Sequence, residues 1–209
     1  MHTFRDYSIK GYIFCVPLPV LVFVTMILSW IAFIVVFLVQ KKPASAPAQK
    51  RERASIVGIA LQGASYALVS IIHRPYFTSI VAMAKPLEIV LAVVTIILAV
   101  SSVWFVSSAV RALGKQWSLS ARVVENHELV THGPYRVVRN PIYSGMLGML
   151  LVTGLALAHW IGLIIALLVF AVGTLIRVRS EEKLMRETFG AQWVEYARRV
   201  PAVLPLLNL

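Results

Sequence analysis

Two short polar segments of this sequence carry residue types that can hold a polar ligand. The first, residues 131–145 (THGPYRVVRNPIYSG), lies against strongly apolar sequence and contains a histidine, two arginines, an asparagine and two tyrosines. Its Gly133-Pro134 pair is a turn signal, and Pro141 biases Asn140 away from helix while suiting the first position of a new one. Irregular backbone beside a membrane is tolerated where it is buried in protein or lines a polar cavity, so the segment predicts a site at a membrane surface.

The second segment, residues 177–201, begins with an ionisable cluster. Arg177 and Glu181 are four positions apart and share one face of a helix, and Glu182 adds an adjacent carboxylate. Ionisable side chains at a membrane boundary are typical of a site for a charged substrate or cofactor.

Both segments also have a plainer interpretation. Tyrosine anchors and arginines that meet lipid phosphates would explain the first segment, and solvated ion pairs worth about 0–1 kcal/mol each would explain the second. Phe189, Trp193 and Tyr196 follow at helical spacing, and we expect them to pack their helix onto the bundle rather than to contact a ligand.

The elements that position these segments are membrane helices. The chain has 209 residues, of which 59% are hydrophobic and 14% charged, and this excludes an ordinary soluble or a disordered protein. We predict an all-α, polytopic membrane bundle formed by one domain over residues 1–209, with about five spans and a C-terminal amphipathic helix. The predicted spans are residues 12–40, 56–72, 87–113, 142–158 and 161–176.

The distribution of basic residues predicts the orientation. Lys and Arg number five in residues 41–55, five in 111–140 and six in 177–199, against two in the N-terminal tail and two after the second span. The three rich segments fall on one side of five spans, which places the N-terminus outside and the C-terminus in the cytoplasm. The same pattern explains the net charge of +11 through membrane lipids, so we expect no nucleic-acid partner.

Two further patterns narrow the class of protein. Cys15 is the single cysteine, which excludes an internal disulfide and a cysteine-based cluster, and we predict no metal site. Without an internal repeat, an inverted-repeat transporter is disfavoured. The break between the last two spans is only His159-Trp160, so these spans form a tight hairpin. The hairpin brings together the two cytoplasmic segments that we expect to carry the chemistry, residues 114–141 and 177–201. These segments contain most of the two polar stretches described above.

The residues HELVTHGPYRVVRNPIYSG, followed some 30 positions later by RVRSEE, resemble the isoprenylcysteine carboxyl methyltransferase family and the related membrane phospholipid methyltransferases. The resemblance covers roughly residues 113–205. It implies an integral membrane methyltransferase that uses S-adenosyl-L-methionine from a cytoplasmic pocket and takes a lipid-like or prenylated substrate from the bilayer.

The resemblance also implies roles for single residues. Arg177 would face the substrate, Glu181 would hold the cofactor or assist the reaction, and Glu182 would support the same site. The cofactor-binding residues that it implies are His127, Glu128, Leu129, Val130, Gly133, Tyr135, Arg139, Asn140, Pro141, Tyr143 and Glu182.

One position departs from the family pattern, which usually reads Arg-His-Pro where this chain reads Arg139-Asn140-Pro141. Asparagine donates and accepts hydrogen bonds as a neutral imidazole does, but it does not titrate near neutral pH. We therefore expect Asn140 to position the cofactor rather than to move protons.

The acceptor stays open between two chemistries. A carboxylate acceptor is already ionised and needs no base, and Arg177 would orient it. A headgroup amine needs a general base, for which Glu181, Glu182 or His132 would serve. Our first hypothesis is a carboxyl methyltransferase, the second an amino-lipid N-methyltransferase on the same scaffold, and the third a non-enzymatic membrane protein.

Overall fold

The structure, a computed structural model, describes residues 17–39, 53–80, 84–114 and 129–205. These residues form an all-helical bundle, which confirms the predicted fold class. The elements are α1 (Leu18–Val39), α2 (Arg53–Ile71), α3 (Lys85–Leu113), the short 3₁₀ helix η2 (Gly133–Arg136), α4 (Pro141–Leu157), α5 (Trp160–Phe189) and α6 (Ala191–Arg199).

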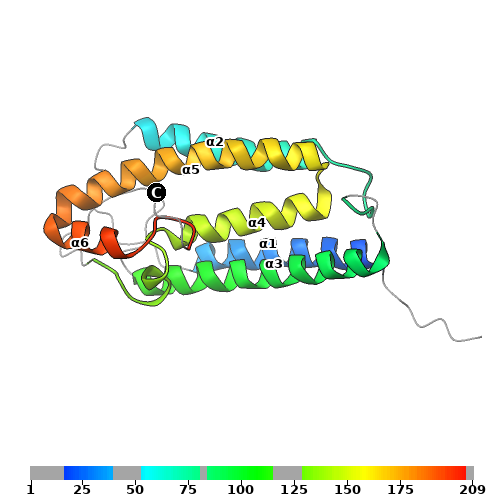
Figure 1. The fold of residues 1–209 in the computed structure, drawn as a ribbon, viewed down its shortest axis with the longest axis horizontal. Helices are drawn as coiled ribbons and strands as arrows, with labels where there is room; N and C mark the ends of the chain where they lie inside the picture. The colour runs from blue at the N-terminus through cyan, green and yellow to red at the C-terminus, as the bar shows by residue number, and fades with distance from the viewer. Residues whose placement is uncertain (1–16, 40–52, 81–83, 115–128, 206–209) are drawn as a thin grey trace, which may run out of the picture.

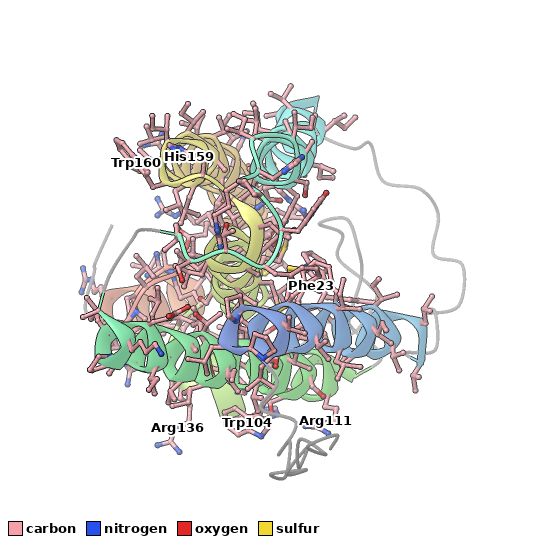
Figure 2. All side chains as sticks on the ribbon, turned by 90° about the vertical axis from the view of Figure 1, so that its right-hand side faces the viewer. Phe23, Trp104, Arg111, Arg136, His159 and Trp160 are labelled. Carbon is pink, nitrogen blue, oxygen red and sulfur yellow. The ribbon has the colours of Figure 1, made fainter. Side chains whose placement is uncertain are left out.

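The long helices form two pairs with α4 between them. Helix α2 packs along α5 and α1 packs along α3, while α4 contacts all four of these helices. The view along the bundle shows α4 between the α2–α5 pair and the α1–α3 pair (Figure 2). Helix α6 lies beside the start of α4 at one end of the molecule (Figure 1). The polar segments of the sequence meet at this end.

Four helices are long and apolar enough to cross a membrane, namely α1, α2, α3 and α5, and α4 is a shorter apolar helix. Residues on their outer faces, such as Leu28, Ile97 and Leu168, are more than half exposed in the isolated chain. Such outward apolar faces need lipid around them, because a soluble protein rarely exposes so much contiguous apolar surface. The protein is therefore an integral, multi-pass membrane protein.

The helices differ from the predicted spans at two ends. Helices α2, α3 and α4 begin and end within three residues of the predicted spans. Helix α1 ends within one residue of the prediction but begins at Leu18, whereas the predicted span begins at residue 12; residues 12–16 lie outside the described part. The fifth span was predicted to end at residue 176, but α5 continues to Phe189. The charged segment is thus the same helix, since nothing interrupts it before Gly190, whose φ of +52° ends it.

Small residues let α4 lie close to its neighbours, as expected for a membrane helix interface. A Cβ added at Gly145 would lie 2.1 Å from Val106 Cγ2 of α3, and one at Gly148 would lie 2.0 Å from Ser102 Oγ. At Gly154, an added Cβ would lie 2.3 Å from Leu163 Cδ1 of α5. Helix α4 therefore lies close to α3 along its first half and close to α5 near its C-terminal end.

The far end of α4 is held by a residue whose role the sequence did not reveal. The buried guanidinium of Arg74 donates to the carbonyl oxygens of Leu155 at 2.8 Å, Ala156 at 3.0 Å and Ala158 at 2.6 Å. The last carbonyls of a helix generally lack partners within it, and a cation suits the negative end of the helix dipole. Next to it, the backbone N–H of His159 donates to Ile72 O at 2.9 Å, which fixes the tight α4–α5 hairpin.

Candidate active site

The first polar segment folds as a short 3₁₀ turn followed by the start of α4. Gly133 begins η2 with a φ of +61°, a value that glycine adopts without strain, and Tyr135 of this turn is buried. Pro141 is the first residue of α4, as the sequence predicts, and Asn140 precedes it in a non-helical conformation. The chain therefore turns sharply at Asn140 and directs Arg139, Asn140 and Tyr143 toward one end of the bundle.

Arg139 connects this turn to α5 and α6. Its Nε donates to Glu182 Oε1 at 2.8 Å, and its Nη1 donates to Ala197 O at 2.8 Å and to Val200 O at 2.5 Å. The Arg139 side chain is only 6% exposed, so these charge-assisted bonds are formed away from bulk water.

The chain that follows α6 pairs with the same turn through backbone atoms. Arg139 N donates to Pro201 O at 2.8 Å, and Asn140 N donates to Ala202 O at 2.9 Å. The Asn140 side chain donates to Ala202 O as well, at 3.1 Å, and its Nδ2 lies 3.5 Å from Glu182 Oε1. These are contacts of a neutral hydrogen-bonding group, and none of them requires a titratable side chain.

A second cluster lies one turn further along α4 and centres on Glu181. The Tyr143 hydroxyl donates to Glu181 Oε1 at 2.5 Å, and Arg177 Nη2 donates to the same oxygen at 3.0 Å. The Arg177 guanidinium also lies over the Tyr143 ring, 5.0 Å from its centre, in a cation–π contact. Both side chains of the Arg177–Glu181 pair are partly buried, at 12% and 20% exposed.

The fold brings the two clusters side by side because Glu181 and Glu182 are consecutive residues of α5. Glu182 faces Arg139 and Asn140, while Glu181 faces Tyr143 and Arg177. This confirms the prediction that the α4–α5 hairpin makes the two polar segments neighbours.

Two buried tyrosines support the turn from the side of α6. The Tyr196 hydroxyl donates to Tyr135 O at 2.7 Å. Burial raises the pKa of the Tyr196 phenol well above its usual value, although nearby Arg139 opposes the effect. Burial likewise raises the pKa of the Tyr135 phenol. Both groups therefore remain protonated over the physiological range.

The remaining predicted residues lie apart from the two clusters or outside the described part. Leu129 packs against the α6 cluster of Trp193, Tyr196 and Val200, and this cluster confirms that the helix aromatics pack onto the protein. Val130 is half-buried and Gly133 is exposed. His127 and Glu128 lie outside the described residues. His132, a candidate base for an amine acceptor, is exposed at the start of η2.

Sequence reasoning missed several partners of these residues. Gln62 of α2, although conspicuous as an amide in an apolar helix, accepts a bond from Arg177 Nη1 at 3.4 Å. The carbonyls of residues 197, 200 and 202 are backbone acceptors, so no sequence pattern indicates them.

A cavity bordered by Arg74, Glu88 and Ala156 lies at the opposite end of α4 from the two clusters.

Comparison with known proteins covers the stretch that holds both clusters. Residues 89–192 match the family model described as phospholipid methyltransferase. Protein-S-isoprenylcysteine O-methyltransferase B of Arabidopsis thaliana is 38% identical over 90 residues, which are 43% of this chain and 46% of that protein. Cobalt-zinc-cadmium resistance protein CzcN of Cupriavidus metallidurans is 36% identical over 105 residues, 46% of this chain and 45% of that protein. The matched stretch thus covers less than half of either relative.

The fold has a relative among solved structures. The eukaryotic intramembrane Ras methyltransferase ICMT (isoprenylcysteine carboxyl methyltransferase) superposes with a TM-score of 0.60 at 16% identity, over 93% of this chain and 70% of that chain. The likeness shows a shared helical membrane fold. The family match and the curated relatives show that about half of this chain is similar to the phospholipid methyltransferases and to protein-S-isoprenylcysteine O-methyltransferases.

Proposed function

We propose that the protein is a membrane-embedded methyltransferase that uses S-adenosyl-L-methionine and methylates the carboxylate of an isoprenylated cysteine or a similar lipid-like acceptor. The observation that carries the proposal is the position of Arg177. It lies where α5 leaves the apolar part of the bundle, and Glu181, Gln62 and the Tyr143 ring hold its guanidinium.

The residues near the two clusters suit such a cofactor. Glu181 and Glu182 are each 20% exposed, and their negative charge favours a cationic sulfonium nearby. Trp193 Nε1 is a buried N–H donor that has no hydrogen-bond partner among the described residues, and Leu129 packs against its cluster. An adenine ring carries acceptor nitrogens that would satisfy such a donor.

When bound, S-adenosylmethionine supplies an electrophilic methyl group, and the carbon–sulfur electron pair remains on sulfur as an acceptor oxygen takes that methyl. The protein's part is to bind and orient. The acceptor must be held about 3–3.5 Å from the methyl carbon, and a fixed guanidinium is suited to hold a carboxylate. The carboxylate is ionised at neutral pH, so no residue has to remove a proton.

The contacts of Glu181 assign one of its two oxygens to holding Arg177, which suits a carboxylate acceptor. A general base for an amine must reach the amine proton with a free oxygen. Tyr143 and Arg177 both donate to Glu181 Oε1, so this oxygen already serves to hold Arg177. N-methylation of an amino lipid is the second candidate. We place the site in the cytoplasm and the N-terminus outside, on the basic-residue counts of the sequence.

The test is a transfer assay on the full chain purified in lipid nanodiscs. Radiolabelled S-adenosylmethionine is supplied with N-acetyl-S-farnesyl-L-cysteine or with phosphatidylethanolamine. A base-labile methyl ester on the farnesyl acceptor supports the proposal, and a base-stable methylamine on the lipid supports the second candidate. If S-adenosylmethionine does not bind by calorimetry and no label is transferred, both enzymatic hypotheses are wrong and the non-enzymatic one remains.

A further inference from the structure

We propose that Gln62 of α2 is a positioning residue that fixes the Arg177 guanidinium for the acceptor carboxylate. This rests on the proposed function, and it assigns a task to a helix that lies outside the stretch matched by the family model, residues 89–192. Gln62 is 2% exposed in the middle of an apolar helix. A buried amide is retained at such a place only where its polar atoms have partners.

The two ends of the Gln62 amide bind two residues of α5. Its Nε2 donates to Thr174 Oγ1 at 2.9 Å, and its Oε1 accepts from Arg177 Nη1 at 3.4 Å. A guanidinium has only donors, so the amide oxygen must be the end that faces Arg177. The Thr174 contact holds the amide in that orientation.

Close packing of the two helices explains why the amide reaches the guanidinium. A Cβ added at Gly58 would lie 2.4 Å from Arg177 Cγ and 2.8 Å from Gly173 O. A Cβ added at Gly173 would lie 2.9 Å from Gly58 O and 3.1 Å from Gln62 N. The aliphatic stem of Arg177 thus lies directly on the α2 backbone, one turn from Gln62.

The other supports of Arg177 come from α4 and from its own helix. Glu181 is four residues further along α5, and the Tyr143 ring lies under the guanidinium from α4. Contacts from α4 and α5 alone leave the long side chain some freedom to turn about its stem. A third contact from α2 removes that freedom, and a shift of about 1 Å in a reacting group can lower a rate about 100-fold.

The test compares Gln62→Leu with Ser65→Ala. Ser65 lies on the same helix, is fully buried and donates to Gln62 O at 2.6 Å, so its loss controls for the removal of a buried hydrogen bond from α2. Full-chain protein in nanodiscs is titrated with N-acetyl-S-farnesyl-L-cysteine and with its carboxamide, which lacks the charge. The ratio of the two dissociation constants reports how well Arg177 recognises a carboxylate, and it needs no methyl transfer.

We expect the wild type and Ser65→Ala to prefer the carboxylate, and Gln62→Leu to reduce that preference roughly tenfold while the carboxamide binds unchanged. Thr174→Val, which frees the Gln62 amide to turn, should also reduce the preference for the carboxylate, but by a smaller factor. This variant provides the test if Gln62→Leu does not fold. In an Arg177→Leu background, Gln62→Leu should change nothing further.

The outcomes separate the two proposals. If the wild type prefers the carboxylate but Gln62→Leu and Thr174→Val keep the full preference, Gln62 is not a positioning residue and the proposed function stands. If Ser65→Ala reduces the preference as much as Gln62→Leu does, the effect belongs to the packing of α2 and the inference is wrong. If the wild type binds the carboxylate and the carboxamide equally well, the proposed acceptor is wrong, and the proposed role of Gln62 is wrong as well.

Discussion

Arg139 and Glu182 form a partly buried ion pair, Nε to Oε1 at 2.8 Å, that joins the turn before α4 to the helix after it. The same arginine donates to two carbonyls at the end of α6. One side chain therefore fixes the relative positions of α4, α5 and the C-terminal segment. Because Glu181 is next to Glu182, this pair also determines where the Tyr143–Glu181–Arg177 cluster lies.

Replacing Arg139 with Leu should destabilise the fold. The change leaves Glu182 without its cation and removes the donor from two carbonyls, and breaking a buried pair in this way costs about 3–5 kcal/mol. Because Glu182 is still 20% exposed, we expect about 2–3 kcal/mol, measured as a lower midpoint of chemical or thermal unfolding in detergent. Arg136→Leu is the control, since Arg136 is exposed and points away from the bundle (Figure 2). Equal loss in both variants would contradict the role of the pair.

Glu181→Gln should lower kcat/KM for the farnesyl acceptor roughly 100-fold and leave the fold intact. The amide keeps an acceptor for the Tyr143 hydroxyl but loses the charge that holds Arg177, so the arginine is no longer fixed. Turnover and the unfolding midpoint are measured on the same preparation. Glu187→Gln is the matched control, because Glu187 is an exposed residue of the same helix. Activity near that of the wild type would remove Glu181 from the site.

Asn140→His should bind S-adenosylmethionine at least as tightly as the wild type. An imidazole N–H can replace Asn140 Nδ2 as the donor to Ala202 O, and the family usually has His at this position. Asn140→Leu, which has no donor, should bind the cofactor more weakly. Calorimetry with S-adenosylmethionine compares the three proteins. Much weaker binding by the histidine variant would mean that the site has been reshaped around asparagine.

The sequence predicted the helices well because membrane spans carry a strong signal. Apolar runs located the four long helices and the shorter α4, and the two-residue break at His159-Trp160 predicted the hairpin between α4 and α5. The fifth predicted span ends at residue 176, whereas α5 continues to Phe189, because a charged segment at helical spacing can continue a helix as well as start a new one. Only Gly190 marks the true end.

The sequence indicated side chains of the candidate site but none of its backbone contacts. Arg139, Tyr143 and Glu181 were named from the family resemblance, and their roles toward a cofactor stay predictions. The pairing of residues 139 and 140 with residues 201 and 202 uses backbone atoms, which leave no pattern in a sequence. Gln62 was visible as a polar residue in an apolar helix, but its partner depends on how closely α2 and α5 pack at Gly58 and Gly173.

Tyr196 should make the stability of the protein fall at alkaline pH. Burial raises the pKa of the folded Tyr196 phenol above its unfolded value near 10, so the folded state binds this proton more tightly. The stabilisation is complete below about pH 10 and is lost as pH rises toward the folded pKa. Unfolding midpoints between about pH 8 and 11.5 should fall less steeply in Tyr196→Phe than in the wild type.

Tyr76→Phe is the control for this titration, because the Tyr76 side chain is largely exposed and should not change the slope. Below pH 10 the Tyr196→Phe variant should still be less stable by about 1 kcal/mol, since it loses the hydrogen bond to Tyr135 O. An unchanged alkaline slope in Tyr196→Phe would mean that other groups govern the loss.

Arg74→Met should destabilise the protein by about 2–4 kcal/mol without changing the affinity for S-adenosylmethionine. The variant removes the donors to three carbonyls at the end of α4, and it removes a cation from the negative end of the helix dipole. The two clusters lie at the other end of α4, so cofactor binding should be retained under conditions where the variant is folded. Lys85→Met, which removes an exposed cation at the start of α3, is the control and should leave the unfolding midpoint nearly unchanged. A loss of cofactor affinity in folded Arg74→Met would show instead that the two ends of α4 are coupled.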